Sequence, residues 1–175
     1  IKKTFKVKDG EFFGLRLRHK LLLELFITFF ISYWLYQLLE VPVVHLPLVG
    51  VFNPGMLYIP FAAFVILAFA NAFNITDGLD GLSSGLLMIA MFAFWVISAS
   101  ILDTPLAVFI ALMIGGLIAF LYFNIYPARV ILGDVGALSF GAIFAVIGLM
   151  LGKPFALVII GGVFVVEAAS SLLQL

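Results

Sequence analysis

The stretch that decides the fold of this chain is MLYIPFAAFVILAFANAFNITDGLDGLSSGLLMIAMFAFWVISASIL, residues 56–102. Two segments, each apolar over about 20 residues and therefore long enough to cross a bilayer, flank the short polar run 71–81. Polar side chains recur in that run at every third residue, so we expect all of them to project toward one side of a continuing helix. They are Asn71, Asn74, Asp77 and Asp80. Carboxylates at a membrane face are usually functional.

The composition places the whole chain among membrane proteins. Its 175 residues are 65% hydrophobic and only 10% charged, and 20 of them are Phe. A soluble domain of this size does not need so much apolar surface. The sequence contains no Cys, which excludes a disulfide framework, a thiolate metal site and a Cys nucleophile. Chemistry based on a hard metal ion or on acid–base catalysis remains open.

We predict an all-α, polytopic bundle of about six transmembrane helices that forms a single integral-membrane domain over residues 1–175. Seven of the nine Lys and Arg residues precede the first span, and by the positive-inside rule this makes residues 1–20 a basic cytoplasmic segment. By alternation along the chain, the loops 71–81 and 123–136 also face the cytoplasm. The predicted spans are Leu21–Leu39, Met56–Phe73, Leu82–Leu102, Pro105–Ile125, Val135–Leu151 and Pro154–Leu175.

The second polar loop, FNIYPARVILGDVG at residues 123–136, contains one acid, Asp134, directly after a glycine. Because both loops share one membrane face, Asp134 can approach Asp77 and Asp80. Three carboxylates with Asn carboxamides nearby, and no His or Cys among them, suit Mg²⁺, which prefers oxygen ligands and usually keeps waters and substrate phosphates. Lysines on the same face would bind those phosphates. The two loops therefore predict a Mg²⁺-dependent phosphoryl-transfer site.

Three stretches of the chain resemble the polyprenyl-phosphate N-acetylhexosamine-1-phosphate transferases, in order and spacing over essentially its whole length. They are NAFNITDGLDGLSSG (71–85), FNIYPARVILGDVGALSFG (123–141) and VFVVEAASSLLQL (163–175). The resemblance implies an enzyme of the bacterial inner membrane that requires Mg²⁺. Such an enzyme transfers a phospho-sugar from a UDP-linked donor to undecaprenyl phosphate within the lipid bilayer and releases UMP. No nucleic-acid partner is expected.

The resemblance also assigns roles by motif position. Asp134 resembles the metal-ligating aspartate of a GD-x-G element, and Asp77 resembles the loop aspartate that supports the metal and the diphosphate. Lys2 resembles the lysine that closes a DD-x-x-K element, and Lys20 resembles a phosphate-side lysine downstream of it. These four residues form the predicted catalytic set. The predicted substrate-binding residues are Asn71, Asn74, Asp80, Asn124, Ile131 and Gly133.

The chain departs from the family pattern in two ways that matter for activity. Ile131 stands where the family usually has an aromatic residue that stacks on uracil, and an aliphatic side chain cannot supply such a stack. The aspartate pair of the DD-x-x-K element would fall just before Ile1. We therefore expect the chain to be an internal piece of a longer protein and to be inactive alone.

Three functions fit these observations: transfer from either of two UDP-linked donors, and ion-coupled transport. Thr76 and residues 135–138 resemble the muramoyl-type members of the family. This resemblance implies a UDP-N-acetylmuramoyl-pentapeptide donor, with lipid I as the product and peptidoglycan biosynthesis as the pathway. The first alternative is transfer of N-acetylglucosamine-1-phosphate to the same lipid. The second alternative, from another class, is an ion-coupled transporter. Transporters usually place their acids near the midplane and show paired repeats, whereas here the acids lie at one face and no internal repeat is evident.

Several of these signals also have structural interpretations. Asp80 could cap the helix that begins near Leu82. The basic residues of 1–20 could serve as a topology anchor and lipid-headgroup patch. The two G-x-x-x-G sequences, Gly81–Gly85 and Gly148–Gly152, favour close helix packing within the chain, with a homodimer as the alternative.

Overall fold

The computed structural model describes residues 17–39, 44–46 and 50–174. In these residues it contains seven α-helices, one short 3-10 helix and one two-stranded hairpin. Five helices are long and apolar enough to cross a membrane, so the prediction of an all-α, multi-pass bundle is confirmed. The helices are α1 (Leu17–Leu38), α2 (Tyr58–Thr76), α3 (Leu82–Ser100), α4 (Thr104–Asn124), α5 (Gly133–Met150), α6 (Pro154–Ile160) and α7 (Gly162–Leu173), with the 3-10 turn η1 (Gly55–Leu57) before α2.

The first five predicted spans agree with α1 to α5 to within a few residues, but the sixth is wrong as a continuous helix. The chain breaks at Gly161, and α6 and α7 are bent by 73°. A Cβ atom at Gly161 would lie 2.7 Å from the ring of Phe69 and 2.8 Å from the carbonyl oxygen of Leu157. Only glycine fits so close to its neighbours, and adjacent glycines are a common cause of a sharp bend.

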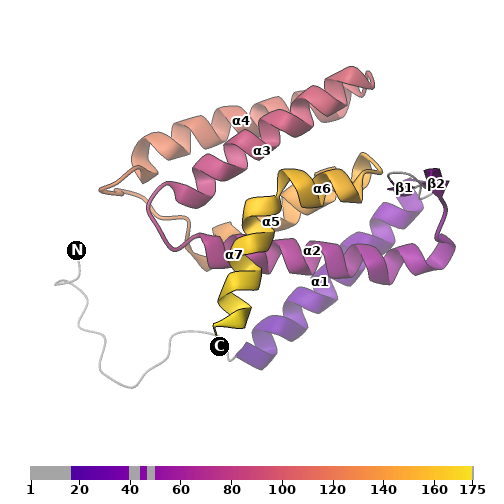
Figure 1. Cartoon of the computed structure of the whole chain (residues 1–175), viewed down its shortest axis with the longest axis horizontal. Helices are drawn as coiled ribbons and strands as arrows, with labels where there is room; N and C mark the ends of the chain where they lie inside the picture. The colour runs from indigo at the N-terminus through magenta and orange to yellow at the C-terminus, as the bar shows by residue number, and fades with distance from the viewer. Residues whose placement is uncertain (1–16, 40–43, 47–49, 175) are drawn as a thin grey trace.

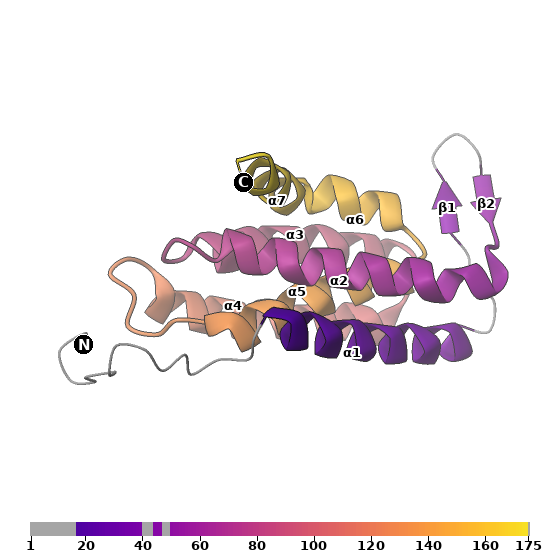
Figure 2. The same cartoon turned by 90° about the horizontal axis from the view of Figure 1, so that it is seen from below.

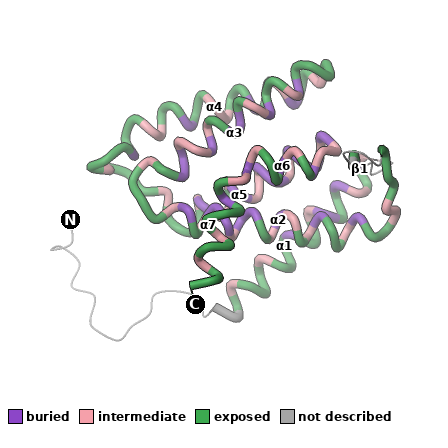
Figure 3. Tube along the Cα trace, viewed as in Figure 1, coloured by how far each residue is buried: buried purple, intermediate pink, exposed green. Residues whose placement is uncertain are grey.

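Helix α2 is the centre of the bundle. It contacts α1, α5 and α7, and Figure 2 shows it between α1 on one side and α6 with α7 on the other. Helices α3 and α4 form an antiparallel pair beside this group (Figure 1). Buried residues gather on α2 and α5, whereas α1 and α4 are largely exposed, as expected for helices that face lipid (Figure 3). The ring of Phe144 packs edge-on against Phe69 and Phe164 in the middle of the core.

Helices α2 and α5 pack at very short range, and this contact sets where the second polar loop lies. A Cβ atom at Gly141 would lie 2.6 Å from the carbonyl oxygen of Phe69 and 2.8 Å from the Cα atom of Ala70. Small residues allow two helix backbones to approach in this way. Gly148 is similarly close to Leu157 of α6, so this G-x-x-x-G sequence packs within the chain.

The two polar loops lie at one end of the bundle. The connections α2–α3 and α4–α5 and the start of α1 share that end, while the opposite end holds the turns α3–α4 and α5–α6 (Figures 1 and 2). The opposite end also carries an antiparallel hairpin of β1 (Val44–Leu46) and β2 (Gly50–Phe52), which was not expected from the sequence. The backbone N–H of His45 donates to the carbonyl oxygen of Gly152 at 2.9 Å and attaches the hairpin to the bundle.

Candidate active site

A polar pocket of about 280 Å³ lies where the two polar loops meet. It is lined by Asn74, Asp77, Gly78, Leu79 and Asp80 from the first loop and by Asn124, Ile131, Leu132, Gly133 and Asp134 from the second. Most of the predicted site residues therefore line one cavity, although the two loops are far apart in the sequence. We call this cavity the polar pocket.

The carboxamide of Asn124 holds the two loops together. Its Oδ1 accepts from the backbone N–H of Gly81 at 3.1 Å and from the hydroxyl of Ser84 at 2.9 Å, and its Nδ2 donates to the carbonyl of Val130 at 2.9 Å. Gly81 has φ +79°, a left-handed conformation that favours glycine. The side chain of Asn124 is buried, and these contacts use three of its four hydrogen-bonding positions.

Two further contacts fix the acids of the first loop. The hydroxyl of Ser83, which is fully buried in the first turn of α3, donates to Oδ1 of Asp77. Asp80 is exposed, and its Oδ2 accepts from the backbone N–H of Ala128 in the second loop at 3.1 Å. The capping interpretation of Asp80 is therefore wrong: the N-cap of α3 is Gly81, without a side-chain cap bond. The serines were not among the predicted site residues, although their position directly after the acidic run was a usable signal.

Lys20 and Asp134 form an ion pair across 114 positions of sequence. The Nζ of Lys20 lies 3.0 Å from Oδ2 of Asp134, which is in the first turn of α5. A carboxylate is favoured there because the N-terminus of a helix carries partial positive charge. The Asp134 side chain is 76% exposed, so the pair contributes little to stability. Its significance is that it places an ammonium group beside the polar pocket.

A second, larger cavity of about 1000 Å³ lies between α1, α2 and α5, and we call it the apolar cavity. It is lined mainly by aliphatic residues; the full set is Lys20, Leu23, Glu24, Ile27, Thr28, Ile31, Leu67, Ala70, Asp134, Val135, Leu138, Ser139, Ala142 and Ile143. Asp134 lines both this cavity and the polar pocket. The ion pair of Lys20 and Asp134 therefore stands at the boundary between a polar space and an apolar one.

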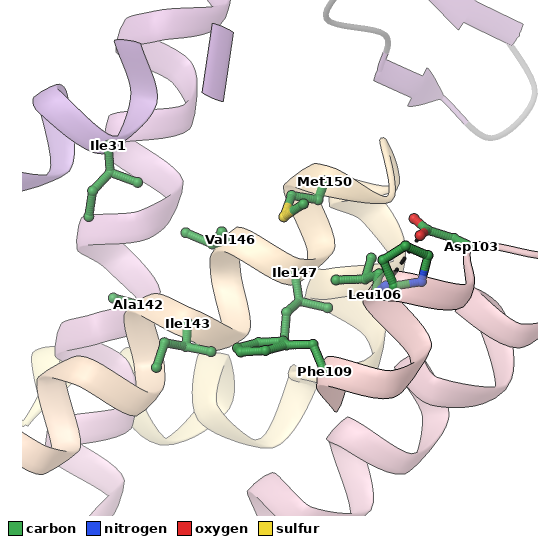
Figure 4. Close-up of a pocket in the computed structure, with 10 residues that line it drawn as sticks. Ile31, Asp103, Leu106, Phe109, Ala142, Ile143, Val146, Ile147 and Met150 are labelled. Carbon is green, nitrogen blue, oxygen red and sulfur yellow. Dashed lines mark hydrogen bonds between the residues drawn. The ribbon is translucent and has the colours of Figure 1, made fainter. Parts of the chain in front are cut away.

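A third space of about 550 Å³ adjoins the apolar cavity on the side away from the polar loops. Figure 4 shows Ile31 of α1, Phe109 of α4 and several residues of α5 around it, with Asp103 at its far end. The carboxylate of Asp103 caps α4 by accepting from the backbone N–H of Leu106 at 3.3 Å. This space is remote from the polar pocket, and we assign no part of the candidate site to it.

One predicted site residue, Asn71, lies elsewhere. The Nδ2 of Asn71 donates to Oε2 of Glu24 at 2.9 Å and to the carbonyl of Leu67 at 3.0 Å, so the prediction that all four polar residues of the first loop face one side is wrong for Asn71. A three-residue step falls about 60° short of a helical turn, so the faces drift apart along the run. Glu24 was missed, although an ionisable residue inside a predicted span was a clear signal. Lys2 lies outside the described residues.

The residues of the polar pocket can be compared with the ligands that Mg²⁺ prefers. In the part of the chain that the structure describes, no group of three or more His, Cys, Asp or Glu residues is placed to hold a metal. The polar pocket does offer the carboxylates of Asp77 and Asp134 and the carboxamide of Asn74, which are all oxygen donors. Proteins usually bind Mg²⁺ through one or two carboxylates, with waters and substrate phosphates in the remaining positions. The donor set fits the ion in that mode.

Comparison with known proteins shows the family to which this membrane-spanning bundle belongs. The chain matches the family described as Glycosyl transferase family 4 over residues 7–152, and it belongs to that family.

Its relatives include three proteins named phospho-N-acetylmuramoyl-pentapeptide-transferase. The one from Clostridium novyi (strain NT) is 37% identical over 98% of this chain and 53% of its own length. The one from Clostridioides difficile (strain 630) is 36% identical over 97% of this chain and 53% of its own length. The one from Staphylococcus epidermidis (strain ATCC 35984) is 40% identical over 92% of this chain and 51% of its own length. The chain thus spans about half the length of the curated relatives it matches.

Proposed function

We propose that this chain supplies the reaction centre of a phospho-N-acetylmuramoyl-pentapeptide transferase of peptidoglycan synthesis. The observation that carries the proposal is the position of Asp134 at the boundary between the polar pocket and the apolar cavity. A UDP-linked sugar is soluble in water, whereas undecaprenyl phosphate keeps its chain in the bilayer and its phosphate at headgroup depth. An enzyme that joins the two must hold both at such a boundary.

The net reaction transfers the phospho-sugar and releases UMP. An oxygen of undecaprenyl phosphate forms a bond to the phosphorus that bears the sugar, the diphosphate bond to UMP breaks, and UMP leaves with the electron pair. The product is lipid I. The names of the relatives favour the muramoyl-pentapeptide donor over N-acetylglucosamine, and the family membership favours transfer over ion-coupled transport.

Each residue of the polar pocket has a role in this proposal. Asp77 and Asp134 would hold Mg²⁺, which when bound neutralises charge on the diphosphate and on the leaving UMP. Ser83 fixes the carboxylate of Asp77 by its hydrogen bond. Lys20, at the mouth of the apolar cavity, would bind the acceptor phosphate by a charge-assisted hydrogen bond. Asn124 acts mainly as a positioning residue.

The remaining predicted residues complete the donor side of the pocket. Asn74 and Asp80 would contact the nucleotide, as would the exposed Ile131. Gly133, with φ +69°, would let the backbone approach the diphosphate.

We place the protein in the bacterial cytoplasmic membrane, with both polar loops and the basic segment 1–20 on the cytoplasmic side. Two observations support this orientation. Most of the basic residues lie in the segment 1–20, and the start of α1 lies at the same end of the bundle as both loops (Figure 2). The UDP-linked donor is also a cytoplasmic compound, so the donor side of the site faces its supply.

A transfer assay tests the proposal. Membranes that contain the gene product would be given labelled UDP-N-acetylmuramoyl-pentapeptide, undecaprenyl phosphate and Mg²⁺, and the formation of labelled lipid and UMP would be followed. We expect Asp134→Asn to abolish transfer while leaving membrane insertion intact. Asp103→Asn is the matched control, because Asn is also a good helix cap and the position lies at the opposite end of the bundle.

Three results would contradict the proposal. Normal turnover by Asp134→Asn would exclude the role given to that carboxylate. Labelled lipid formed only from UDP-N-acetylglucosamine would replace the donor. Solute flux in proteoliposomes without UMP release would favour a transporter.

A further inference from the structure

One face of α1 forms a wall of the apolar cavity, and it carries two opposite charges. The cavity-lining residues of α1 recur at the three- and four-residue steps of a single helix face. They are Lys20, Leu23, Glu24, Ile27, Thr28 and Ile31. Glu24 therefore follows Lys20 by one helical turn on the same wall. The proposed reaction uses Lys20 and gives no role to Glu24.

Only half of the Glu24 carboxylate is satisfied. Its Oε2 accepts from Nδ2 of Asn71, and Asn71 is itself fixed by its bond to the carbonyl of Leu67. Its Oε1 is buried and has no hydrogen-bond partner within residues 17–39, 44–46 and 50–174. A buried carboxylate oxygen without a donor is unfavourable, so this atom marks a position that a donor should occupy.

Two donors lie four residues from Glu24 on this face, Lys20 and Thr28, and the hydroxyl of Thr28 already donates to the carbonyl of Leu25. Lys and Glu at a four-residue spacing are neighbours on a helix surface, and the lysine stem is long and flexible. In this structure its ammonium is paired with Asp134 of α5 at 3.0 Å. Lys20 therefore has two carboxylates within the same cavity, one on α5 at the boundary with the polar pocket and one on α1 deeper in the wall.

We propose that Glu24 is a positioning residue that forms an ion pair with the ammonium of Lys20 when Asp134 binds a ligand. The inference rests on the proposed function, in which Asp134 holds a divalent cation. A cation at Asp134 repels the ammonium of Lys20 and competes for the same oxygen atoms. The side chain of Lys20 is partly buried, so its released ammonium gains from a nearby counter-charge, and the buried free oxygen of Glu24 gains a donor. Lys20 then stays at the mouth of the apolar cavity, where the acceptor phosphate arrives.

The inference makes cation affinity depend on Glu24. A ligand that binds only one of two conformations has its affinity reduced by the fraction of molecules in the other. Pairing of Lys20 with Glu24 lowers the fraction of molecules in which Lys20 is paired with Asp134 and blocks the cation. Removing the charge of Glu24 should therefore weaken cation binding at Asp134, although Glu24 does not touch the cation.

Binding of Mn²⁺ to the full gene product in detergent, measured by the electron paramagnetic resonance signal of the free ion, tests this inference. We expect Glu24→Gln to weaken Mn²⁺ binding roughly two- to fivefold, the range of a partly exposed ion pair. Gln keeps an oxygen for Asn71, so the fold should persist. Asp103→Asn, a matched acid-to-amide change at the other end of the bundle, should bind Mn²⁺ as the wild type does.

Two further measurements test whether Glu24 acts through Lys20. The first repeats Mn²⁺ binding in a protein that carries Lys20→Met, and the second is the transfer assay. Without Lys20, Glu24→Gln should have little further effect on Mn²⁺ binding. In the transfer assay, Glu24→Gln should raise the Mg²⁺ concentration for half-maximal rate and leave kcat near that of the wild type. A purely structural role would instead lower kcat and the amount of folded protein together.

Each contrary outcome has a distinct meaning. Equal Mn²⁺ affinity of Glu24→Gln and wild type overturns the inference and leaves the proposed function standing. An equal loss of affinity with and without Lys20 also overturns it, because Glu24 would then act on the cation directly. No Mn²⁺ binding by the wild type overturns the inference together with the metal role in the proposed function.

Discussion

Replacing Asn124 by Ala tests whether one buried carboxamide holds the two polar loops together. The change removes three hydrogen bonds, from Gly81 at 3.1 Å, from Ser84 at 2.9 Å and to Val130 at 2.9 Å. A typical hydrogen bond contributes about 1 kcal/mol net, and a buried group left without its partner costs more. We expect the free energy of unfolding to fall by about 3 kcal/mol, which is roughly a 100-fold change in the unfolding equilibrium.

Unfolding by SDS in mixed micelles, followed by circular dichroism, measures this change. The matched variant is Asn74→Ala, which removes the same side chain from the same pocket. Asn74 makes no side-chain hydrogen bond within the residues that the structure describes, so its variant should unfold close to the wild type. If Asn124→Ala unfolds at the same SDS fraction as Asn74→Ala, the carboxamide does not join the loops and the reasoning is refuted.

Two further predictions concern helix packing and the support of Asp77. Gly141→Ala should lower the free energy of unfolding by about 1–3 kcal/mol, because the new Cβ would lie 2.6 Å from the carbonyl oxygen of Phe69 and the two backbones must move apart. Gly115→Ala, which meets nothing within 4 Å, should leave stability unchanged or raised; equal thermal midpoints for the two variants would contradict the close packing. Ser83→Ala should reduce UMP release roughly tenfold and lower the thermal midpoint slightly, because Asp77 loses its buried donor. A wild-type rate would show that Asp77 needs no such support.

The membrane spans were predictable because their signal is local. A helix in lipid satisfies its backbone hydrogen bonds internally, so a sufficient length of apolar sequence determines the span wherever the neighbouring helices lie. The helix ends near Gly81 and Asp103 were also predictable from local signals. Gly81 adopts a left-handed turn before α3, and the side chain of Asp103 caps α4. The break at Gly161 escaped prediction because α6 and α7 together are as apolar as one span, and the bend depends on the side chains of Phe69 and Leu157 that press on the glycine.

The sequence predicted most of the residues that line the candidate site, but it did not predict their hydrogen-bond partners. The order of spans along the chain brings the two polar loops to one end of the bundle, and this order alone was enough to place Asp77 and Asp134 together. The hydroxyl that fixes Asp77 and the acid that binds Asn71 were not found, since both contacts depend on how α3 and α1 turn about their axes.

By itself, then, the sequence determined the class of protein, the five clear spans and the two polar loops, because length, hydropathy and charge act along the chain. Only the tertiary structure decided which side chains meet. The pairing of Lys20 with Asp134 across 114 positions, and the turn of Asn71 away from the polar pocket, follow from helix rotation and packing distance. Those quantities are set by contacts between distant segments, such as Gly141 against Phe69, and a local pattern in the sequence does not contain them.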